Sequence, residues 1–406
     1  MKLLHLADLH IGMENYSRTD PATGMNTRLL DYLARLDEAI AIGQESDVDA
    51  VLIAGDIYKN RTPNPTHQRE FARRIHALRS TGVPVVILTG NHDVSPAAGR
   101  AHSIEIFDTL AVEGVLIVDR PRLLRLDTRA GILQIIALPW VTRHNLLAKE
   151  ELQLKALVEI EAMLLDRIDR FLRQAAEDLD RSLPTVLMAH ASIDGATLGA
   201  ERQVLLGKDL VLSRSMVAQP GVDYVALGHI HRHQSLGEHP PIVYPGSIER
   251  IDFGEEHEAK GCVIVDIEPG QARWQFFPLA ARPFLTIDVD VRGASDPAER
   301  ITRAIARHAL SDAVVRMRIE ADTAQANALS TLDIQRQIET AGAHYVAAVA
   351  IEIERPARPR LGTAADELLE GLTPRRALEL YLRSRETPEA RITALLAAAD
   401  ELAAEQ

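Results

Sequence analysis

Five short hydrophobic runs along the chain each end in polar residues that can bind metals or transfer protons. Their length, their β-branched residues and the glycine or polar positions that bound them are typical of buried strands in an α/β sheet. The runs lie at Leu3–Ala7, Ala50–Ala54, Val83–Leu88, Thr185–Met188 and Tyr224–Leu227. Ligands gather at the carboxyl ends of strands in such a sheet, so we expect these five ends to converge on one pocket.

Amphipathic helices are predicted between these strands. Apolar residues recur at intervals of three and four in 28–36, in 69–78 and in a longer segment of about 145–180. We expect the long helix to end before Pro184, because proline cannot continue a helix.

After His231 the pattern changes to short strands without helices between them. The predicted strands are 242–244, 262–267 and 272–277. Pro269 and Gly270 favour a hairpin turn between the last two. A region that begins with alternating strands and helices and ends antiparallel indicates two packed sheets with helices outside, so we expect residues 1–280 to form one α/β domain.

Residues 281–355 predict a second, smaller α/β domain. The predicted strands are 284–291, 313–320 and 344–354, and the predicted helices are about 297–310 and 329–340. This region contains two histidines, His308 and His344, and no cluster of metal-ligand type. We interpret it as an accessory domain.

A linker with Pro356, Pro359 and Gly362 leads into a helical tail, so that 356–406 forms the third part of the chain. The predicted tail helices lie near 364–371, 374–385 and 388–404. Apolar stripes run along the last two helices: Leu378, Tyr381 and Leu382 on one, and Ile392, Leu395, Leu396, Ala399 and Leu402 on the other. Packing within the chain and docking onto a partner helix both remain open.

The composition is that of an ordinary globular protein long enough to be an enzyme. The chain has 406 residues, 46% of them hydrophobic and 25% charged, and its mean hydropathy is −0.06. No apolar run of about 18 residues is present, so we expect no membrane span. A predicted strand begins at Lys2, so we expect no cleavable signal, and the single Cys262 fits a reducing cytoplasm.

The net charge of −13 argues mildly against a protein that coats nucleic acid by bulk electrostatics. A metal pair, a limited basic surface or a partner subunit would have to help hold any nucleic acid.

The residues at the five strand ends predict a site for two metal ions. Carboxylate, amide and imidazole ligands without thiolates suit Mn²⁺, Fe²⁺ or Zn²⁺. With Asp56 as a bridge the ligands divide into two shells: Asp8, His10, Asp56 and His231 for one ion, and Asp56, Asn91, His190 and His229 for the other. In extended backbone, residues two apart point the same way, so both imidazoles of His229-Ile230-His231 can face the pocket. Two cations about 4 Å apart can activate a water and clamp the oxygens of a phosphate, which predicts hydrolysis of a phosphoester.

His92 is not needed in either shell and is therefore predicted to act in catalysis. It is placed to stabilise the charge of the transition state or to protonate the departing oxygen, with Asp93 orienting its other nitrogen. The alternative is that His92 is a structural histidine.

The ordered set of motifs resembles the calcineurin-like metallophosphoesterase superfamily, and within it the branch of SbcD-type nuclease subunits of bacterial SbcCD complexes. The motifs are Asp8-Leu9-His10, Gly55-Asp56, Gly90-Asn91-His92-Asp93, His190 and Gly228-His229-Ile230-His231, together with the stretch Tyr244-Pro245-Gly246-Ser247-Ile248-Glu249-Arg250-Ile251-Asp252-Phe253-Gly254-Glu255. This last stretch is the most specific for the branch. The resemblance is strong over about 1–280, rests on pattern in the accessory domain, and rests on length and amphipathicity in the tail.

The resemblance implies a calcineurin-like two-sheet core flanked by helices, a capping domain and C-terminal helices that bind an SbcC-type ATPase subunit. It implies an Mn²⁺-dependent DNA nuclease that acts as a 3′→5′ exonuclease on duplex ends and as an endonuclease on hairpins and single strands. It also implies a homodimer within a heterotetramer, in DNA repair in the cytoplasm.

One position departs from that family pattern. Three residues after Asp56 the archaeal and eukaryotic members carry a histidine and bacterial members often carry an acidic residue, whereas this chain has Lys59. A contact from Lys59 to a DNA phosphate and a solvated side chain are the two open interpretations.

Two other functions use the same features. A small-molecule phosphodiesterase or phosphomonoesterase would need the same metals. The protein phosphatases of the superfamily follow Gly-Asp with Asp-Arg-Gly, whereas this chain reads Gly55-Asp56-Ile57-Tyr58. A binding subunit with an inert pocket is the third interpretation, and the intact ligand set at all five strand ends argues against it.

Overall fold

The computed structural model divides into two compact units, Met1–Glu352 and Ile353–Gln406. The described residues are 1–94, 101–141, 157–199, 209–353, 374–385 and 387–404. The first part of the helix expected over 145–180 and the tail helix expected at 364–371 lie outside these ranges.

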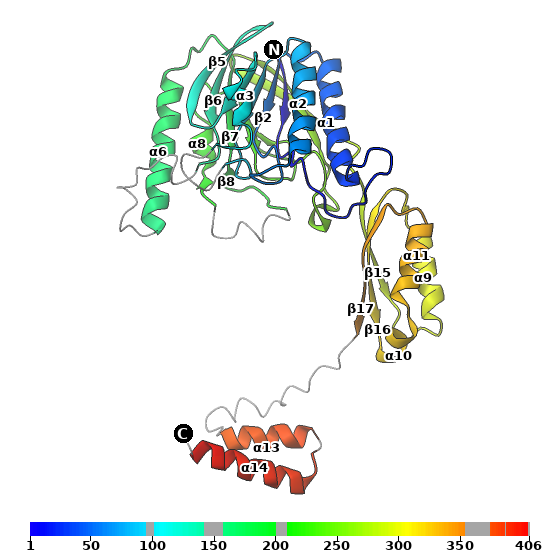
Figure 1. Ribbon diagram of the computed structural model, residues 1–406. Coiled ribbons are helices and arrows are strands. Elements are labelled where there is room, and N and C mark those ends of the chain that lie inside the picture. Colours follow the sequence, from blue (N-terminus) through cyan, green and yellow to red (C-terminus); the bar gives the residue numbers. More distant parts are fainter. Residues whose placement is uncertain (95–100, 142–156, 200–208, 354–373, 386, 405–406) are drawn as a thin grey trace. The chain divides into compact units, whose positions relative to one another are not determined.

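The larger unit contains two six-stranded sheets (Figure 1). In the first sheet, β1 to β4 are parallel, and β13 and β14 add an antiparallel edge beside β1. In spatial order its strands are β14 (Gln271–Pro278), β13 (Gly261–Glu268), β1 (Lys2–Leu6), β2 (Ala50–Ile53), β3 (Val85–Leu88) and β4 (Val115–Val118). The strands expected at the first three hydrophobic runs and the expected hairpin are therefore confirmed.

The second sheet has a parallel centre and antiparallel strands at both edges. In spatial order its strands are β11 (Gln234–Glu238), β12 (Pro241–Tyr244), β10 (Tyr224–Gly228), β7 (Thr185–His190), β6 (Gly131–Leu138) and β5 (Arg122–Thr128). Two short strands, β8 (Ser192–Ile193) and β9 (Val211–Leu212), form a separate parallel pair. The hydrophobic pattern did not predict the hairpin of β5 and β6.

Strand β1 shows how the layers are sorted. Leu3 belongs to the core between the two sheets, whereas Leu4 and Leu6 belong to the core under the helices of the first sheet. This is the alternation expected when both faces of a strand are buried. The helices of the unit's two-sheet part are α1 (Thr27–Glu45), α2 (Pro65–Ser80), α3 (Glu105–Thr109), α6 (Leu157–Glu177) and α8 (Arg214–Val217), with a 3-10 turn η1 (Phe253–Glu255).

Helices α1 and α2 begin where the sequence provides caps. The side chain of Asn26 accepts from the backbone at the start of α1, and Asn64 does so for α2, which continues with Pro65. The apolar faces of these helices cover the outside of the first sheet, and α6 covers the second sheet (Figure 1). The two-sheet α/β core flanked by helices is thus confirmed.

A three-stranded sheet follows in the same unit. Its strands are β15 (Phe284–Asp290), β16 (Val314–Ala321) and β17 (Tyr345–Ile353), and its helices are α9 (Pro297–Ala306), α10 (Thr323–Ala328) and α11 (Thr331–Thr340). The helix expected over 297–310 ends at Ala306. Helix α11 begins at Thr331, two residues later than expected, with Ser330 as its N-cap. The core of this part is aliphatic. A cluster of Tyr16, Phe253, Phe284 and Tyr345 joins it to the two-sheet part.

The second unit contains α13 (Pro374–Ser384) and α14 (Glu389–Ala404). They pack on one another through Leu382, Ile392 and Leu396. Part of each predicted stripe is therefore used within the unit, while Tyr381 and Leu395 are exposed. Among the described helices of both units, none is long and apolar enough to cross a membrane.

Candidate metal centre

The carboxyl ends of β1, β2, β3, β7 and β10 meet as the sequence predicts. Ligand atoms of their residues form three mutually close groups, each within 4.8 Å: Asp8, His10 and His231; His10, Asp56 and His92; Asp8, Asp56 and His190. Asn91 and His229 join them, because Asn91 Oδ1 lies 3.0 Å from both His190 Nε2 and His229 Nδ1. All seven predicted metal ligands are therefore brought together.

The backbone at these strand ends adopts conformations that ordinary residues avoid. Asp8, His10, Asp56 and His229 have φ angles of 52°, 43°, 54° and 103°. Left-handed backbone at non-glycine residues costs about 1–3 kcal/mol each and persists where the surroundings impose it. Hydrogen bonds from Asp8 N to Gly55 O and from His10 N to Asp56 O, both 3.1 Å, hold the first two ends together.

Two glycines allow the strand ends to approach so closely. A Cβ on Gly90 would lie 2.1 Å from Asp56 Oδ1, and a Cβ on Gly55 would lie 2.3 Å from His190 Nδ1. No side chain fits at either position, which explains the Gly-Asp and Gly-Asn pairs of the sequence.

We call Asp8, His10 and His231 the first half of the site. His10 Nε2 lies 2.9 Å from His231 Nε2 and 3.8 Å from Asp56 Oδ2. The Asp8 carboxylate also accepts from the backbone N–H of His229 at 3.0 Å. His10 and His231 are 221 residues apart in sequence, and all three side chains of this half are buried.

We call Asn91, His190 and His229 the second half, and Asp56 lies between the halves. His190 Nε2 is 3.6 Å from Asp56 Oδ2, on the same carboxylate oxygen that faces His10. Asp56 is 1% exposed. Its position fits the bridging carboxylate expected from the sequence.

The outer nitrogens of three imidazoles are tied to hydrogen-bond acceptors. His190 Nδ1 lies 2.7 Å from the Ala54 carbonyl, His229 Nε2 lies 2.7 Å from Asp209 Oδ2, and His231 Nδ1 lies 2.8 Å from Glu255 Oε1. Each outer nitrogen must donate its proton to such an acceptor, so the inner nitrogen of the neutral ring carries a lone pair that points into the site. Lone pairs that converge on one another repel unless a cation lies between them, so the donor set fits a dinuclear metal site. His10 Nδ1 is buried and has no hydrogen-bond partner among the described residues.

The ionisation of the metal-free site shows the same need for positive charge. Burial would lower the pKa of His190, but the Asp56 and Asp8 carboxylates outweigh it and raise this pKa to about 9. Burial would raise the pKa of Asp56, but His190 and His10 hold it well below its usual range. Bound protons thus compensate the buried carboxylates where cations would otherwise do so.

The structure corrects the expected pairing of His92 with Asp93. His92 Nδ1 lies 2.6 Å from the backbone carbonyl of Lys59, so this carbonyl orients the ring. The fully buried Asp93 carboxylate instead accepts from the backbone N–H groups of Gly90 at 2.9 Å and Ile57 at 3.1 Å. Asp93 thus joins the segment after β3 to the segment after β2. Burial raises the pKa of Asp93 to about 7.

Two residues at the site were missed by the sequence analysis. Glu255 ends the stretch that carries the most specific part of the family resemblance, and this was the available signal. Asp209 follows no recognisable strand and belongs to no motif, so the sequence offered no sign of its contact with His229.

Comparison with known proteins agrees with this geometry. The model of the calcineurin-like phosphoesterase family matches residues 1–233, which include all the site residues except Glu255. The chain belongs to this family.

The chain is also similar to SbcD and to Mre11 proteins. It is 29% identical to the SbcD component of the nuclease SbcCD of Rhodobacter capsulatus, over 77% of both chains, and 28% identical to that of Escherichia coli, over 67% of this chain and 66% of the relative. It is 26% identical to the DNA double-strand break repair protein Mre11 of Archaeoglobus fulgidus, over 63% of this chain and 52% of the relative. The matched part thus spans between half and about three quarters of these relatives.

Proposed function

We propose that this chain is the nuclease subunit of an SbcCD-type DNA repair complex and hydrolyses DNA phosphodiesters with two divalent metal ions. The observation that carries the proposal is the cluster of imidazoles around Asp56. Nitrogens of His190 and His10 lie 3.6 Å and 3.8 Å from the same Asp56 oxygen, and the outer nitrogens of His190, His229 and His231 are fixed by hydrogen-bond acceptors. The similarity to SbcD and Mre11 nucleases supports DNA as the substrate.

The two ions would be held by the two halves of the site. Asp8, His10, Asp56 and His231 would bind one ion, and Asp56, Asn91, His190 and His229 the other. We propose Mn²⁺ as the physiological ion. Nitrogen and oxygen donors without thiolates suit Mn²⁺, Fe²⁺ or Zn²⁺, and the resemblance to SbcD-type nucleases favours Mn²⁺ among them. When bound, such an ion pair activates a water and neutralises the charge of the phosphate.

His92 is the proposed acid at the departing oxygen. It is partly exposed, its ring lies 5.0 Å from that of His10, and the Lys59 carbonyl fixes the proton on Nδ1. A ring nitrogen of His92 lies within 4.8 Å of ligand atoms of His10 and Asp56. Because the Lys59 carbonyl holds the Nδ1 proton, His92 would act as the doubly protonated imidazolium, give its Nε2 proton to the departing oxygen and become the neutral ring. We propose that the partly exposed Lys59 side chain contacts a DNA phosphate beside it.

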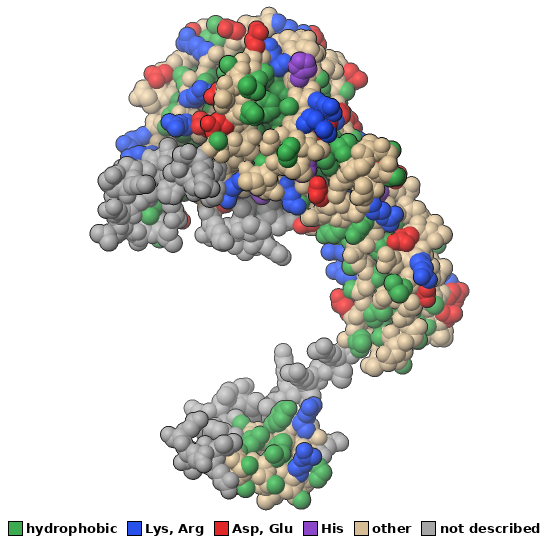
Figure 2. Space-filling view, in the orientation of Figure 1, with side chains coloured by type: hydrophobic (Ala, Val, Ile, Leu, Met, Phe, Trp, Pro, Cys, Tyr) green, Lys and Arg blue, Asp and Glu red, His purple; other side chains and the backbone are tan. Residues whose placement is uncertain are grey.

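The net charge of −13 means that metal ions, a local basic surface or a partner subunit would have to help bind DNA. Figure 2 shows acidic and basic side chains interspersed over the visible face of the larger unit. We propose a division into a nuclease domain at 1–280, a capping domain at 281–355 that helps position DNA, and a linker with C-terminal helices at 356–406. We place the protein in the cytoplasm as a homodimer.

The C-terminal helices are the proposed site for an SbcC-type ATPase subunit. Figure 2 shows hydrophobic side chains gathered on the visible face of the second unit, and Tyr381 and Leu395 are 57% and 40% exposed. Removing the residues after 360 should abolish co-purification with such an ATPase and leave basal DNA cleavage intact. A truncated chain that still binds the ATPase would refute this role.

A hydrolysis panel in Mn²⁺ tests the proposed substrate. It compares hairpin DNA, duplex DNA, cyclic nucleotides and para-nitrophenyl phosphate, with the Asp56→Asn variant as a control for contaminating enzymes. We expect cleavage of both DNA substrates. Activity confined to the small molecules would favour the alternative, a small-molecule phosphodiesterase or phosphomonoesterase.

A further inference from the structure

Behind the first half of the site, the imidazole of His231 rests on a buried ion pair. His231 Nδ1 lies 2.8 Å from Glu255 Oε1, and Glu255 Oε2 lies 2.9 Å from Lys260 Nζ. The side chains of Glu255 and Lys260 are 1% and 0% exposed. Neither residue belongs to the proposed metal ligands.

Stability is a poor explanation for this ion pair. Removing two charges from water costs several kcal/mol per ion, and apolar replacements of buried pairs are often neutral or stabilising. A buried pair at this position therefore calls for another role, and both of its members contact His231, a residue of the metal site.

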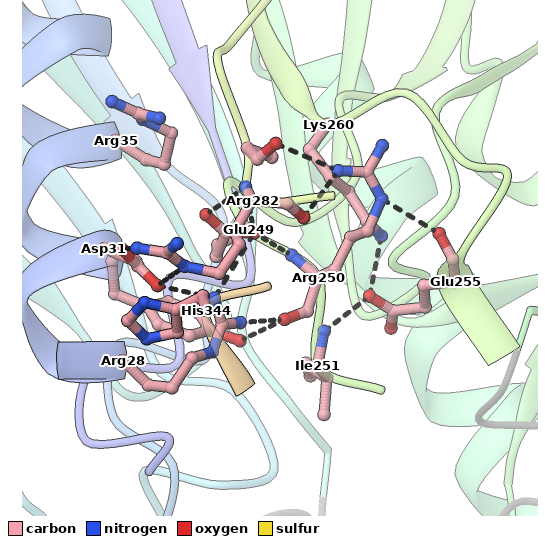
Figure 3. A network of polar contacts seen from close by, with 12 residues as sticks. Arg28, Asp31, Arg35, Glu249, Arg250, Ile251, Glu255, Lys260, Arg282 and His344 are labelled. Atoms are coloured by element: carbon pink, nitrogen blue, oxygen red, sulfur yellow. Dashed lines mark hydrogen bonds and ion pairs between the residues drawn. The ribbon is translucent and has the colours of Figure 1, made fainter. Parts of the chain in front are cut away.

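The Glu255–Lys260 pair contacts both the ring and the backbone of His231. Glu255 Oε2 also accepts from the backbone N–H of Ile251 at 2.9 Å, so both carboxylate oxygens are occupied (Figure 3). Lys260 Nζ donates to the backbone carbonyl of His231 at 3.1 Å. The ring and the backbone of His231 are thus attached to the same two side chains, and its Nε2 is directed at His10 Nε2, 2.9 Å away.

Arg250 holds the loop that carries Glu255. Its guanidinium donates to the carbonyls of Glu255 at 3.3 Å, Glu258 at 2.8 Å and Arg282 at 3.0 Å (Figure 3). The backbone of the loop is therefore anchored to the segment that leads into β15, while the Glu255 side chain itself is held by the Ile251 N–H and by Lys260.

We propose that Glu255 is a positioning residue of the metal site, which fixes the tautomer and the ring orientation of His231 for the ion in the first half, while Lys260 holds Glu255 in place. A carboxylate behind a histidine ligand also makes its inner nitrogen more basic. This inference rests on the proposed metal-dependent hydrolase and adds a residue to its machinery.

Glu258 provides a matched control. Its carboxylate also lies 2.9 Å from Lys260 Nζ, whereas the oxygen that accepts from His231 Nδ1 belongs to Glu255. Glu255→Gln and Glu258→Gln therefore each remove one charge beside the same lysine, and only the first removes the charged acceptor of His231 Nδ1.

The experiment is calorimetric titration of the full chain with Mn²⁺, fitted to two sites. In Glu255→Gln we expect about tenfold or greater weakening of one ion, in line with the 10–100-fold cost of losing such a carboxylate, and an unchanged affinity for the other. In Glu258→Gln we expect both affinities within about twofold of the wild type. Because the readout is metal affinity, it does not depend on cleavage.

Wild-type affinities in Glu255→Gln would overturn the inference, and so would equal weakening in the two variants. A wild-type chain that binds no ion would instead overturn the proposed function itself. Should Glu255→Gln fail to fold, the double variant Glu255→Gln/Lys260→Met removes both charges of the buried pair and is titrated against the wild type. It should bind one ion about tenfold or more weakly than the wild type, and wild-type affinity for both ions would overturn the inference.

Discussion

The two halves of the metal site use the same residue types but rest on different supports. In the first half, His231 is backed by a fully buried carboxylate that is paired with a lysine. In the second half, His190 is backed by the neutral carbonyl of Ala54, and His229 by Asp209.

The charged support of the second half, Asp209, is also closer to solvent than Glu255. The Asp209 side chain is 10% exposed and accepts from Ser192 Oγ at 3.1 Å, with no lysine or arginine among its described contacts. Charge-assisted hydrogen bonds strengthen as water is excluded, so the first half should depend more strongly on its carboxylate than the second. The same imidazole ligand can therefore be held by charge or by backbone geometry, with different sensitivity to substitution.

The largest effect is expected where the halves meet. Asp56→Asn removes the charge shared by both ions and keeps an oxygen that can accept from His92 N. We expect loss of measurable Mn²⁺ binding in both halves and a fall in cleavage of about 10³-fold or more, since the metal pair contributes several kcal/mol. Asp49→Asn, just before the other end of β2, is the control, and loss of only one ion in Asp56→Asn would contradict a bridging role.

The next largest effect distinguishes DNA cleavage from metal binding in the two halves. His92→Ala should reduce DNA cleavage by about 10²-fold or more, as for a lost acid, while calorimetry shows both Mn²⁺ affinities unchanged. His76→Ala removes an exposed histidine on α2 and should change neither. Undiminished cleavage in His92→Ala would remove His92 from the mechanism.

A smaller effect tests the difference between the supports directly. Asp209→Asn keeps an acceptor for His229 Nε2 but removes the charge, and we expect less than about tenfold weakening of one Mn²⁺ ion. Competition between Asp209→Asn and Glu255→Gln for limiting Mn²⁺ would rank them. If Asp209→Asn proves the more damaging, burial of the supporting carboxylate does not decide its importance.

The smallest effect concerns a buried histidine outside both halves. Burial lowers the pKa of His5 to about 3, and His233 adds to the lowering, while the contact of His5 Nε2 with the Leu227 carbonyl at 3.1 Å acts in the opposite direction. The other ring nitrogen lies 3.0 Å from Tyr224 Oη. The folded pKa lies below the unfolded value, so stability from this group is complete above about pH 6.5 and falls by about 1.4 kcal/mol per pH unit toward pH 3. Urea unfolding at pH 7 and pH 5 should show a shallower loss in His5→Gln than in the wild type. Equal losses would show that His5 is not kept neutral. The pKa of His5 would then not be shifted in the direction opposite to that of His190, which the site carboxylates raise.

The sequence predicted the ligands because strand ends leave a local signal. Asp8, Asp56, Asn91, His190 and His229 each follow a hydrophobic run, and parallel strands bring such positions to one edge. The location of Asp56 between His10 and His190 also agrees with the prediction from the sequence, since its preceding glycine permits the turn.

The supports could not be predicted in the same way. Asp209 reaches His229 from a segment with no regular pattern, and the fit of Glu255 depends on a loop whose shape is set by distant carbonyls. The pairing of His92 with the Lys59 carbonyl was also invisible, because backbone acceptors carry no residue-specific signal. Local patterns thus identify the residues that cluster at the site, whereas the groups that orient them depend on tertiary geometry.

The indole of Trp140 provides an optical reporter of the second half. Its ring lies 4.9 Å from that of His229 and 6.0 Å from that of His190. The chain has two tryptophans. The other, Trp274, is on β14, and its ring lies against that of His233. Replacing Trp274 by Phe would leave a protein whose fluorescence arises beside the second half alone, so that the arrival of its ion could be timed without a dye.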